Sequence, residues 1–169
     1  TYGAEMGFVA VNQGLQVLGG YGYTEDFPLE QLARDVRIMS LYEGTTGIQS
    51  QALLGRQVVG NQGKTLVLWY NEVGKTIHHA EHDPTLSPYW EALMASLRQF
   101  QKVTAHQFKL ATEGDMEVLL ADANLYMEAF GILNVAWQWL LQGIAAVESL
   151  KKEGIQGEEL TFYQSKIDS

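Results

Sequence analysis

Apolar residues recur every three to four positions along most of the chain, which is the spacing of one face of an α-helix. In the first third of the chain this spacing predicts a helix over residues 2–18, a second from 28 to a break at 42–47, and a third over about 48–59. Gly19 and Gly20 are expected to end the first helix, because glycine is common just past a helix end. No stretch alternates between apolar and polar residues for long enough to predict a strand.

The rest of the chain carries longer apolar stripes. They predict a helix over 66–80 that ends at Asp83-Pro84, a helix over 90–111, one long and strongly apolar helix over 116–150, and a last helix from Glu158 onward. We therefore expect an all-α fold in which one helical bundle is followed by a second helical bundle.

Composition divides the chain near Gly63. Residues 1–63 hold 11 of the 17 glycines, whereas residues 64–169 hold all four tryptophans and all four histidines. We predict two units with this boundary. A chain of 169 residues, 46% of them apolar, is long enough to bury a core without cross-links.

The charge and cysteine content exclude several classes of function. The chain has no cysteine, which excludes disulfides, thiolate catalysis and cysteine-ligated metal sites. Its net charge of −9 argues against a nucleic-acid partner and against an anionic membrane surface, since both require clustered Lys and Arg. His78 and His82 have a spacing at which two imidazoles can share a metal ion, but a solvated helix end is the favoured explanation, and we predict no metal site.

Residues 129–147 are uncharged and long enough to span a bilayer. Within them Asn134, Gln138 and Gln142 form one polar stripe, which favours a hydrogen-bonded seam between packed helices, so we predict no membrane span. The chain starts at Thr1, inside an expected helix, as a piece of a longer protein would. Nothing at this start looks like a signal peptide, and we expect a cytoplasmic protein.

The first motif with possible chemistry is Gln16-Val17-Leu18-Gly19-Gly20-Tyr21-Gly22-Tyr23. Glycines let a backbone approach a ligand closely, and their bare amides can hold a phosphate. The alternative is a glycine-rich helix stop with aromatic anchors.

The second motif is Tyr42-Glu43-Gly44-Thr45-Thr46-Gly47-Ile48-Gln49. A carboxylate such as Glu43 suits a general base when apolar or aromatic groups raise its pKa. Thr45, Thr46 and the start of the following helix can bind an anion such as a diphosphate. The alternative is an N-capping threonine beside a solvated glutamate.

Together with the pair Arg34-Asp35 between them, these motifs make residues 13–56 resemble the C-terminal catalytic segment of the acyl-CoA dehydrogenase family. The resemblance implies that residues 1–63 are the last helices of that family's C-terminal four-helix bundle. It also implies that 64–169 form the additional C-terminal helical domain of its large members, truncated at its last helix.

The resemblance implies an FAD-dependent enzyme that desaturates an acyl-CoA thioester and passes electrons to an electron-transfer flavoprotein. The catalytic base would be Glu43, whose backbone N–H would also bind the thioester carbonyl, with Tyr42 and Gly44 against the substrate. Members of the family are oligomers, so we expect a homo-oligomer. An alternative is that the isolated chain is only a helical packing and oligomerisation module.

The resemblance also implies which residues contact the flavin. Gln16, Gly19 and Gly20 match positions at the FAD of a neighbouring subunit, and Thr45, Thr46 and Gly47 match positions at the FAD diphosphate and adenosine. Arg56 follows Gln49 by seven positions, where many short members of the family have six. On an α-helix one extra residue turns a side chain by about 100°, so we expect Arg56 to miss a coenzyme A contact.

Overall fold

The computed structural model describes residues 1–152 and 154–168, and within them the chain forms helices and turns without a strand, as the apolar spacing predicts. The helices are α1 (Tyr2–Leu18), η1 (Gly19–Tyr23), α2 (Leu29–Ile38), α3 (Thr46–Gln51), η2 (Ala52–Val59), α4 (Lys64–Ala80), η3 (Pro84–Leu86), α5 (Ser87–Glu113), α6 (Met116–Ala121), α7 (Ala123–Leu150) and α8 (Gly157–Asp168).

Local signals in the sequence account for most helix ends. Gly19 ends α1 with a φ of 57°, and Gly114 ends α5 with a φ of 83°, conformations that favour glycine. The Asp83 carboxylate caps the turn η3 by accepting a hydrogen bond from the Thr85 N–H at 3.0 Å. Asp115 starts α6 in the same way, because its carboxylate accepts from the Val118 N–H at 3.1 Å.

The expectation of one unbroken helix over 116–150 is wrong. The chain leaves helical geometry at Asp122, with φ of −95° and ψ of 11°, and this residue separates α6 from α7. Aspartate is a weak helix former, so the change of direction costs little there. The break lets the fully buried Leu119 of α6 and the buried Ala123 of α7 both reach the core.

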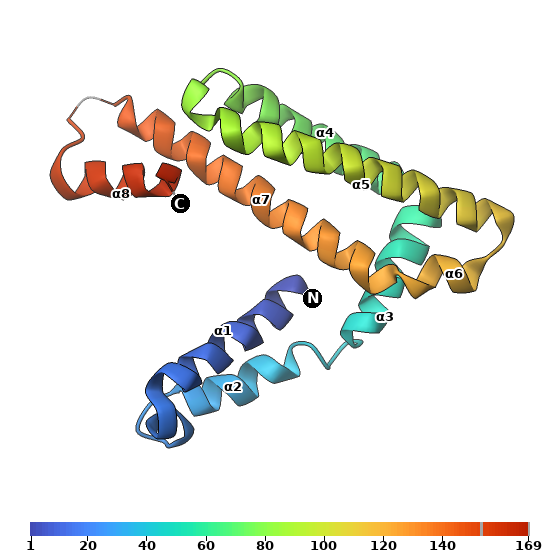
Figure 1. Cartoon of the computed structure of the whole chain (residues 1–169), viewed down its shortest axis with the longest axis horizontal. Helices are drawn as coiled ribbons and strands as arrows, with labels where there is room; N and C mark the ends of the chain where they lie inside the picture. The colour runs from blue at the N-terminus through green and yellow to red at the C-terminus, as the bar shows by residue number, and fades with distance from the viewer. Residues whose placement is uncertain (153, 169) are drawn as a thin grey trace.

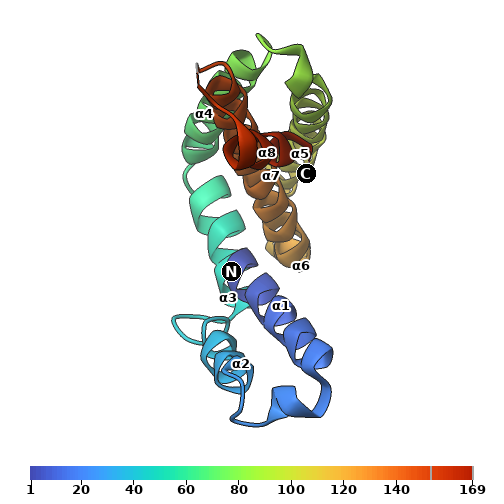
Figure 2. The same ribbon diagram turned by 90° about the vertical axis from the view of Figure 1, so that its left-hand side faces the viewer.

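Helices α4, α5 and α7 pack together, while α1 and α2 form a hairpin that extends away from them (Figures 1 and 2). Aromatic rings fill the centre of the packed helices: the Trp69 and Phe130 ring centroids are 4.8 Å apart, and those of Phe100 and Tyr126 are 4.7 Å apart. In the described part of the chain every buried apolar side chain lies at or after Leu54. The hairpin therefore has no fully buried apolar residue of its own.

The face of α7 that packs on α4 carries hydrogen bonds between tryptophans and polar side chains. The Trp69 indole donates to the Asn134 side-chain oxygen at 3.0 Å, and the Trp137 indole donates to the Thr76 hydroxyl at 2.8 Å. Asn134 thus lies in a seam between helices, as the polar stripe suggested, whereas Gln138 and Gln142 are exposed.

Among the described helices, α7 is long and apolar enough to cross a membrane by length and composition. In this structure it packs against α3, α4, α5 and α8. These contacts bury 33% of its most apolar 18-residue window.

Candidate active site

The loop between α2 and α3 holds Tyr42, Glu43 and Gly44 in an unusual backbone conformation. Glu43 has a φ of 57°, a left-handed conformation that a non-glycine residue rarely adopts, and Gly44 follows with a φ of 102°. The Gln49 side-chain amide donates to the Glu43 carbonyl at 2.5 Å and ties the loop to α3. This hydrogen bond between residues six positions apart holds the loop in its conformation at Glu43.

Glu43 itself is left free to contact a ligand. Its side chain is exposed, and within the described residues its carboxylate takes part in no ion pair or hydrogen bond. The N–H groups of residues 39–42 donate to carbonyls of α2, but no described acceptor takes the N–H of Glu43. This chain does not enclose the carboxylate in an apolar pocket, because Tyr42 beside it is also exposed.

A cleft of about 460 Å³ adjoins this loop. Three separate parts of the chain line it, namely the start of α1, the loop with the first turns of α3 and η2, and one side of α7: Thr1, Tyr2, Met39, Tyr42, Glu43, Gly44, Gln49, Leu53, Met127, Phe130 and Gly131. The structure thus brings Tyr42, Glu43 and Gly44 together at one cleft.

The α7 wall of this cleft was missed from the sequence. Gly131 lies directly under Tyr2, since a Cβ atom at Gly131 would be 2.8 Å from the Tyr2 Cβ. The Thr1 hydroxyl donates to the Met127 sulfur at 2.9 Å at the same crossing. The sequence signal for this close approach is glycine inside an apolar helix, since Gly131 is one of two glycines in α7.

The three predicted flavin contacts near Glu43 differ in whether their polar groups already make hydrogen bonds within the protein. Thr45 occupies the N-cap position of α3, but its hydroxyl makes no capping hydrogen bond. The Thr46 hydroxyl donates to the Glu5 carboxylate of α1. The Gly47 carbonyl accepts from the Ser50 hydroxyl at 2.8 Å. Thr45 is thus the residue of the three whose side chain is available to a ligand.

Gln16, Gly19 and Gly20 lie at the other end of the α1–α2 hairpin from Glu43 (Figure 1). The 17 residues of α1 span about 25 Å, so the two motifs do not meet in one site. Gln16 is exposed, and a Cβ atom at Gly19 or Gly20 would meet no atom within 4 Å. Gly22, in contrast, is buried against the Leu15 backbone.

These residues fit the polar edge of a dinucleotide such as FAD. The first end of the hairpin offers exposed backbone and the Gln16 amide, and the second offers the unbonded Thr45 hydroxyl at a helix start. Because the two ends are far apart, each offers a separate surface to a ligand.

Arg56 lies in the π-helix η2, where the Gly60 N–H bonds to the Gly55 carbonyl at 2.9 Å. The expected rotation of about 100° assumed an α-helix and is wrong, because a π-turn accommodates an extra residue in a wider turn.

The histidines at the end of α4 make local pairs. The His78 ring lies 3.3 Å from the Glu81 carboxylate, and His79 Nε2 lies 3.0 Å from the Glu148 carboxylate. Within residues 1–152 and 154–168, no group of three or more His, Asp or Glu side chains is arranged to hold a metal ion.

Two family models match the chain. Residues 69–169 match the model described as acetyl-CoA dehydrogenase C-terminal like, and residues 1–58 match that of the acyl-CoA dehydrogenase C-terminal domain. The chain belongs to the acyl-CoA dehydrogenase family. Its motifs around Glu43 and Gly20 lie within the second of these matches.

Curated acyl-CoA dehydrogenases are similar over nearly the whole chain. A broad-specificity linear acyl-CoA dehydrogenase of Mycobacterium tuberculosis is 29% identical over 98% of this chain and 28% of its own length. A butyryl-CoA dehydrogenase of Syntrophomonas wolfei is 28% identical over 100% of this chain and 27% of its own length. A 3-methylmercaptopropionyl-CoA dehydrogenase of Ruegeria pomeroyi is 32% identical over 91% of this chain and 26% of its own length. The chain spans about a quarter of the length of these relatives.

Proposed function

We propose that this chain is the C-terminal part of an FAD-dependent acyl-CoA dehydrogenase and supplies the base for α,β-desaturation of an acyl-CoA thioester. The observation that carries the proposal is the state of Glu43. Its carboxylate and its backbone N–H are both unpartnered in the described structure, at the edge of a cleft, within the family's Tyr-Glu-Gly-Thr motif.

Glu43 would act through two of its groups. The carboxylate removes the proton α to the thioester carbonyl. The Glu43 N–H donates a hydrogen bond to the carbonyl oxygen and stabilises the negative charge that develops there. The turn that takes up the N–H groups of residues 39–42 ends before Glu43, whose N–H has no described acceptor. Tyr42 and Gly44 line the cleft beside the reacting carbons.

FAD, when bound, supplies the acceptor for the hydride that leaves the β carbon. Thr45, Thr46 and Gly47 would hold its diphosphate and adenosine side, while Gln16, Gly19 and Gly20 would contact the FAD of a neighbouring subunit. This chain holds only the edge of the group, so the rest of the enzyme must supply most of the flavin site.

The proposal includes the partners of the whole enzyme: an acyl-CoA substrate, an electron-transfer flavoprotein and further copies of the same protein in the cytoplasm. The α1–α2 hairpin carries exposed apolar residues that favour assembly with other helices. They include Met6, Val9, Val17, Leu32 and Ile38. By itself the chain would act as a helical packing module, because it holds only the base and the edge of the flavin site.

The test is flavin reduction by substrate in the full-length enzyme. Glu43→Gln keeps the shape and the backbone N–H but removes the base, so the rate should fall by about 10²–10⁴-fold while FAD stays bound. Glu25→Gln, at the exposed tip of the same hairpin, is the matched control and should reduce its flavin normally. Near-wild-type reduction in Glu43→Gln would refute the assignment.

A further inference from the structure

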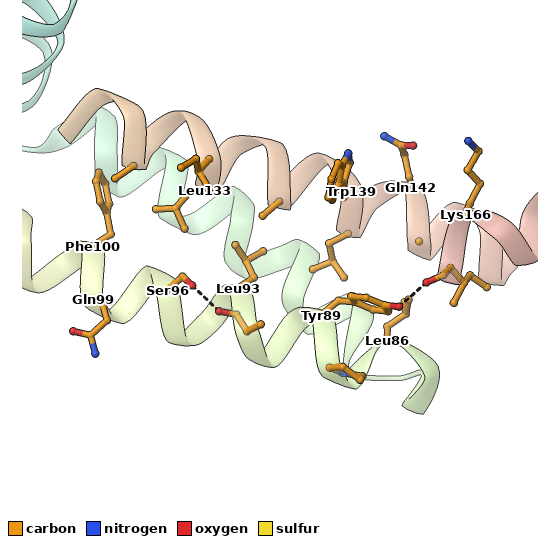
Figure 3. A pocket seen from close by; sticks show the side chains of 18 of the residues that line it. Leu86, Tyr89, Leu93, Ser96, Gln99, Phe100, Leu133, Trp139, Gln142 and Lys166 are labelled. Atoms are coloured by element: carbon orange, nitrogen blue, oxygen red, sulfur yellow. Dashed lines mark hydrogen bonds between the residues drawn. The ribbon is translucent and has the colours of Figure 1, made fainter. Parts of the chain in front are cut away.

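A second and larger groove runs between α5 and α7 (Figure 3). Its volume is about 820 Å³, within the range of about 300–1,000 Å³ that small-molecule sites occupy. The α5 residues that line it run from Pro88 to Val103, a length of about 22 Å along the helix. The groove is thus long enough for an extended aliphatic chain.

This groove is distinct from the Glu43 cleft. The cleft uses Met127, Phe130 and Gly131 of α7, whereas the groove uses residues such as Leu133 and Ala136. At about 100° per residue the two sets of α7 residues centre on opposite sides of that helix. The groove therefore belongs to no site described above.

The walls of the groove are apolar. The buried side chains of Leu93 and Phe100 on α5 and of Leu133 on α7 lie between the two helices (Figure 3). Small residues such as Ala136 keep the space between the two long helices open. The apolar surface that the groove leaves exposed belongs to Val103, Ile132 and Trp139. Such surface is unfavourable in water by about 25 cal/mol per Å², so an apolar occupant is preferred to water.

Two hydroxyl groups of the groove are used within the protein. The Tyr89 hydroxyl donates to the Ile167 carbonyl at 2.6 Å, and the Ser96 hydroxyl donates to the Ala92 carbonyl at 2.9 Å (Figure 3). The amides of Gln99 and Gln142 are the remaining exposed polar groups of the lining apart from Lys166, and an apolar chain in the groove has to leave them in contact with water.

Lys166 of α8, at one end of the groove, is the one ionic side chain among the described residues that line it (Figure 3). Its ammonium lies 5.1 Å from the Phe162 ring centroid and joins none of the ion pairs in the described part of the chain. An unpaired cation at the end of an apolar groove favours a single negative charge on the ligand.

We infer that this groove binds a long-chain monocarboxylate, with its tail between α5 and α7 and its carboxylate at Lys166. A coenzyme A thioester fits poorly, because its several phosphate charges would face a single lysine. The inference stands apart from the proposed desaturation, since it uses neither Glu43 nor any predicted flavin contact.

Brominated stearate is the direct probe, because bromine quenches a tryptophan that it contacts. Trp139 lines the groove and is 64% exposed, so the probe should quench it saturably. Trp139→Phe should remove most of this quenching. Ala92→Phe, which fills the groove, should abolish binding, whereas Ala95→Phe, on α5 but outside the lining, should not. Equal binding of the probe by Ala92→Phe and Ala95→Phe would overturn the site.

The head group is tested with lysine variants and competitors. Lys166→Gln should weaken binding about tenfold. Lys64→Gln, an exposed lysine away from the groove, should leave the affinity unchanged. Palmitate should displace the probe, whereas palmitoyl-CoA and hexadecyltrimethylammonium should compete poorly. Equal competition by all three, or no saturable binding by the full-length protein, would overturn the inference and leave the groove as a surface for another helix.

Discussion

Gly22 occupies a position in the turn η1 where no side chain fits. A Cβ atom there would lie 2.7 Å from the Leu15 carbonyl oxygen and 3.0 Å from the Leu15 Cα. Both are backbone atoms, so they cannot move aside as the end of a flexible side chain would. The variant Gly22→Ala must therefore push the turn away from the end of α1.

The size of the effect follows from two opposing contributions. Forcing extra volume into a packed site costs about 1–3 kcal/mol. Replacing glycine by alanine returns about 0.5–1 kcal/mol of backbone entropy. The net loss is between about 0 and 2.5 kcal/mol, centred on about 1.3 kcal/mol. It should be local, because η1 packs mainly against α1 and α2 and this end of the hairpin can open alone.

Amide hydrogen exchange measures this opening. In Gly22→Ala the amides of residues 15–24 should exchange about tenfold faster, since 1.4 kcal/mol corresponds to a factor of ten. Gly20→Ala is the matched control, because a Cβ atom at Gly20 meets no atom within 4 Å. If both variants exchange alike, the packing argument for Gly22 fails. In the full-length enzyme Gly20→Ala should instead weaken FAD binding without loosening the turn.

Three further predictions concern assembly, packing and pH. The chain should self-associate through residues 1–60, whose apolar side chains before Leu54 are not buried; a monomer mass by light scattering with slow exchange in those residues would contradict this. Thr76→Val leaves the half-buried Trp137 indole N–H unpaired and should cost about 1–3 kcal/mol in urea denaturation, whereas Thr76→Ser should cost less. Hydrogen bonds from Lys151 and Thr85 lower the pKa of Asp83 from 3.8 to about 2. The stabilisation of the fold by the Asp83 carboxylate is therefore present above pH 3.8 and is lost as the pH falls toward 2. In thermal unfolding, wild type should be more stable than Asp83→Asn at pH 7, and the two should converge near pH 2.

Short-range chemistry made most of the fold predictable from the sequence. Gly19, Asp83 and Gly114 end or cap helices through contacts with residues a few positions away, and a sequence pattern records such contacts directly. Asp122 gave no comparable signal, because the apolar spacing continues across it and the bend depends on how α6 returns from α5.

The candidate site likewise has features that the sequence predicted and features that it did not. The Tyr42-Glu43-Gly44 motif was visible in the sequence, but its left-handed backbone and unbonded N–H were not. The contact of Tyr2 with Gly131 joins residues 129 positions apart and depends on how two helices cross. Long-range crossings of this kind leave only weak traces in a single sequence, such as one glycine in an apolar helix.

The central claim, that Glu43 removes the α proton, is tested most directly by exchange of that proton with solvent. The full-length enzyme, with its flavin already reduced so that no hydride can leave, is incubated with a saturated acyl-CoA in deuterated water. Mass spectrometry then follows deuterium at the α carbon. Our account predicts exchange by the wild type and by Glu25→Gln, and a loss of exchange in Glu43→Gln with acyl-CoA still bound. Exchange at the wild-type rate in Glu43→Gln would contradict the account.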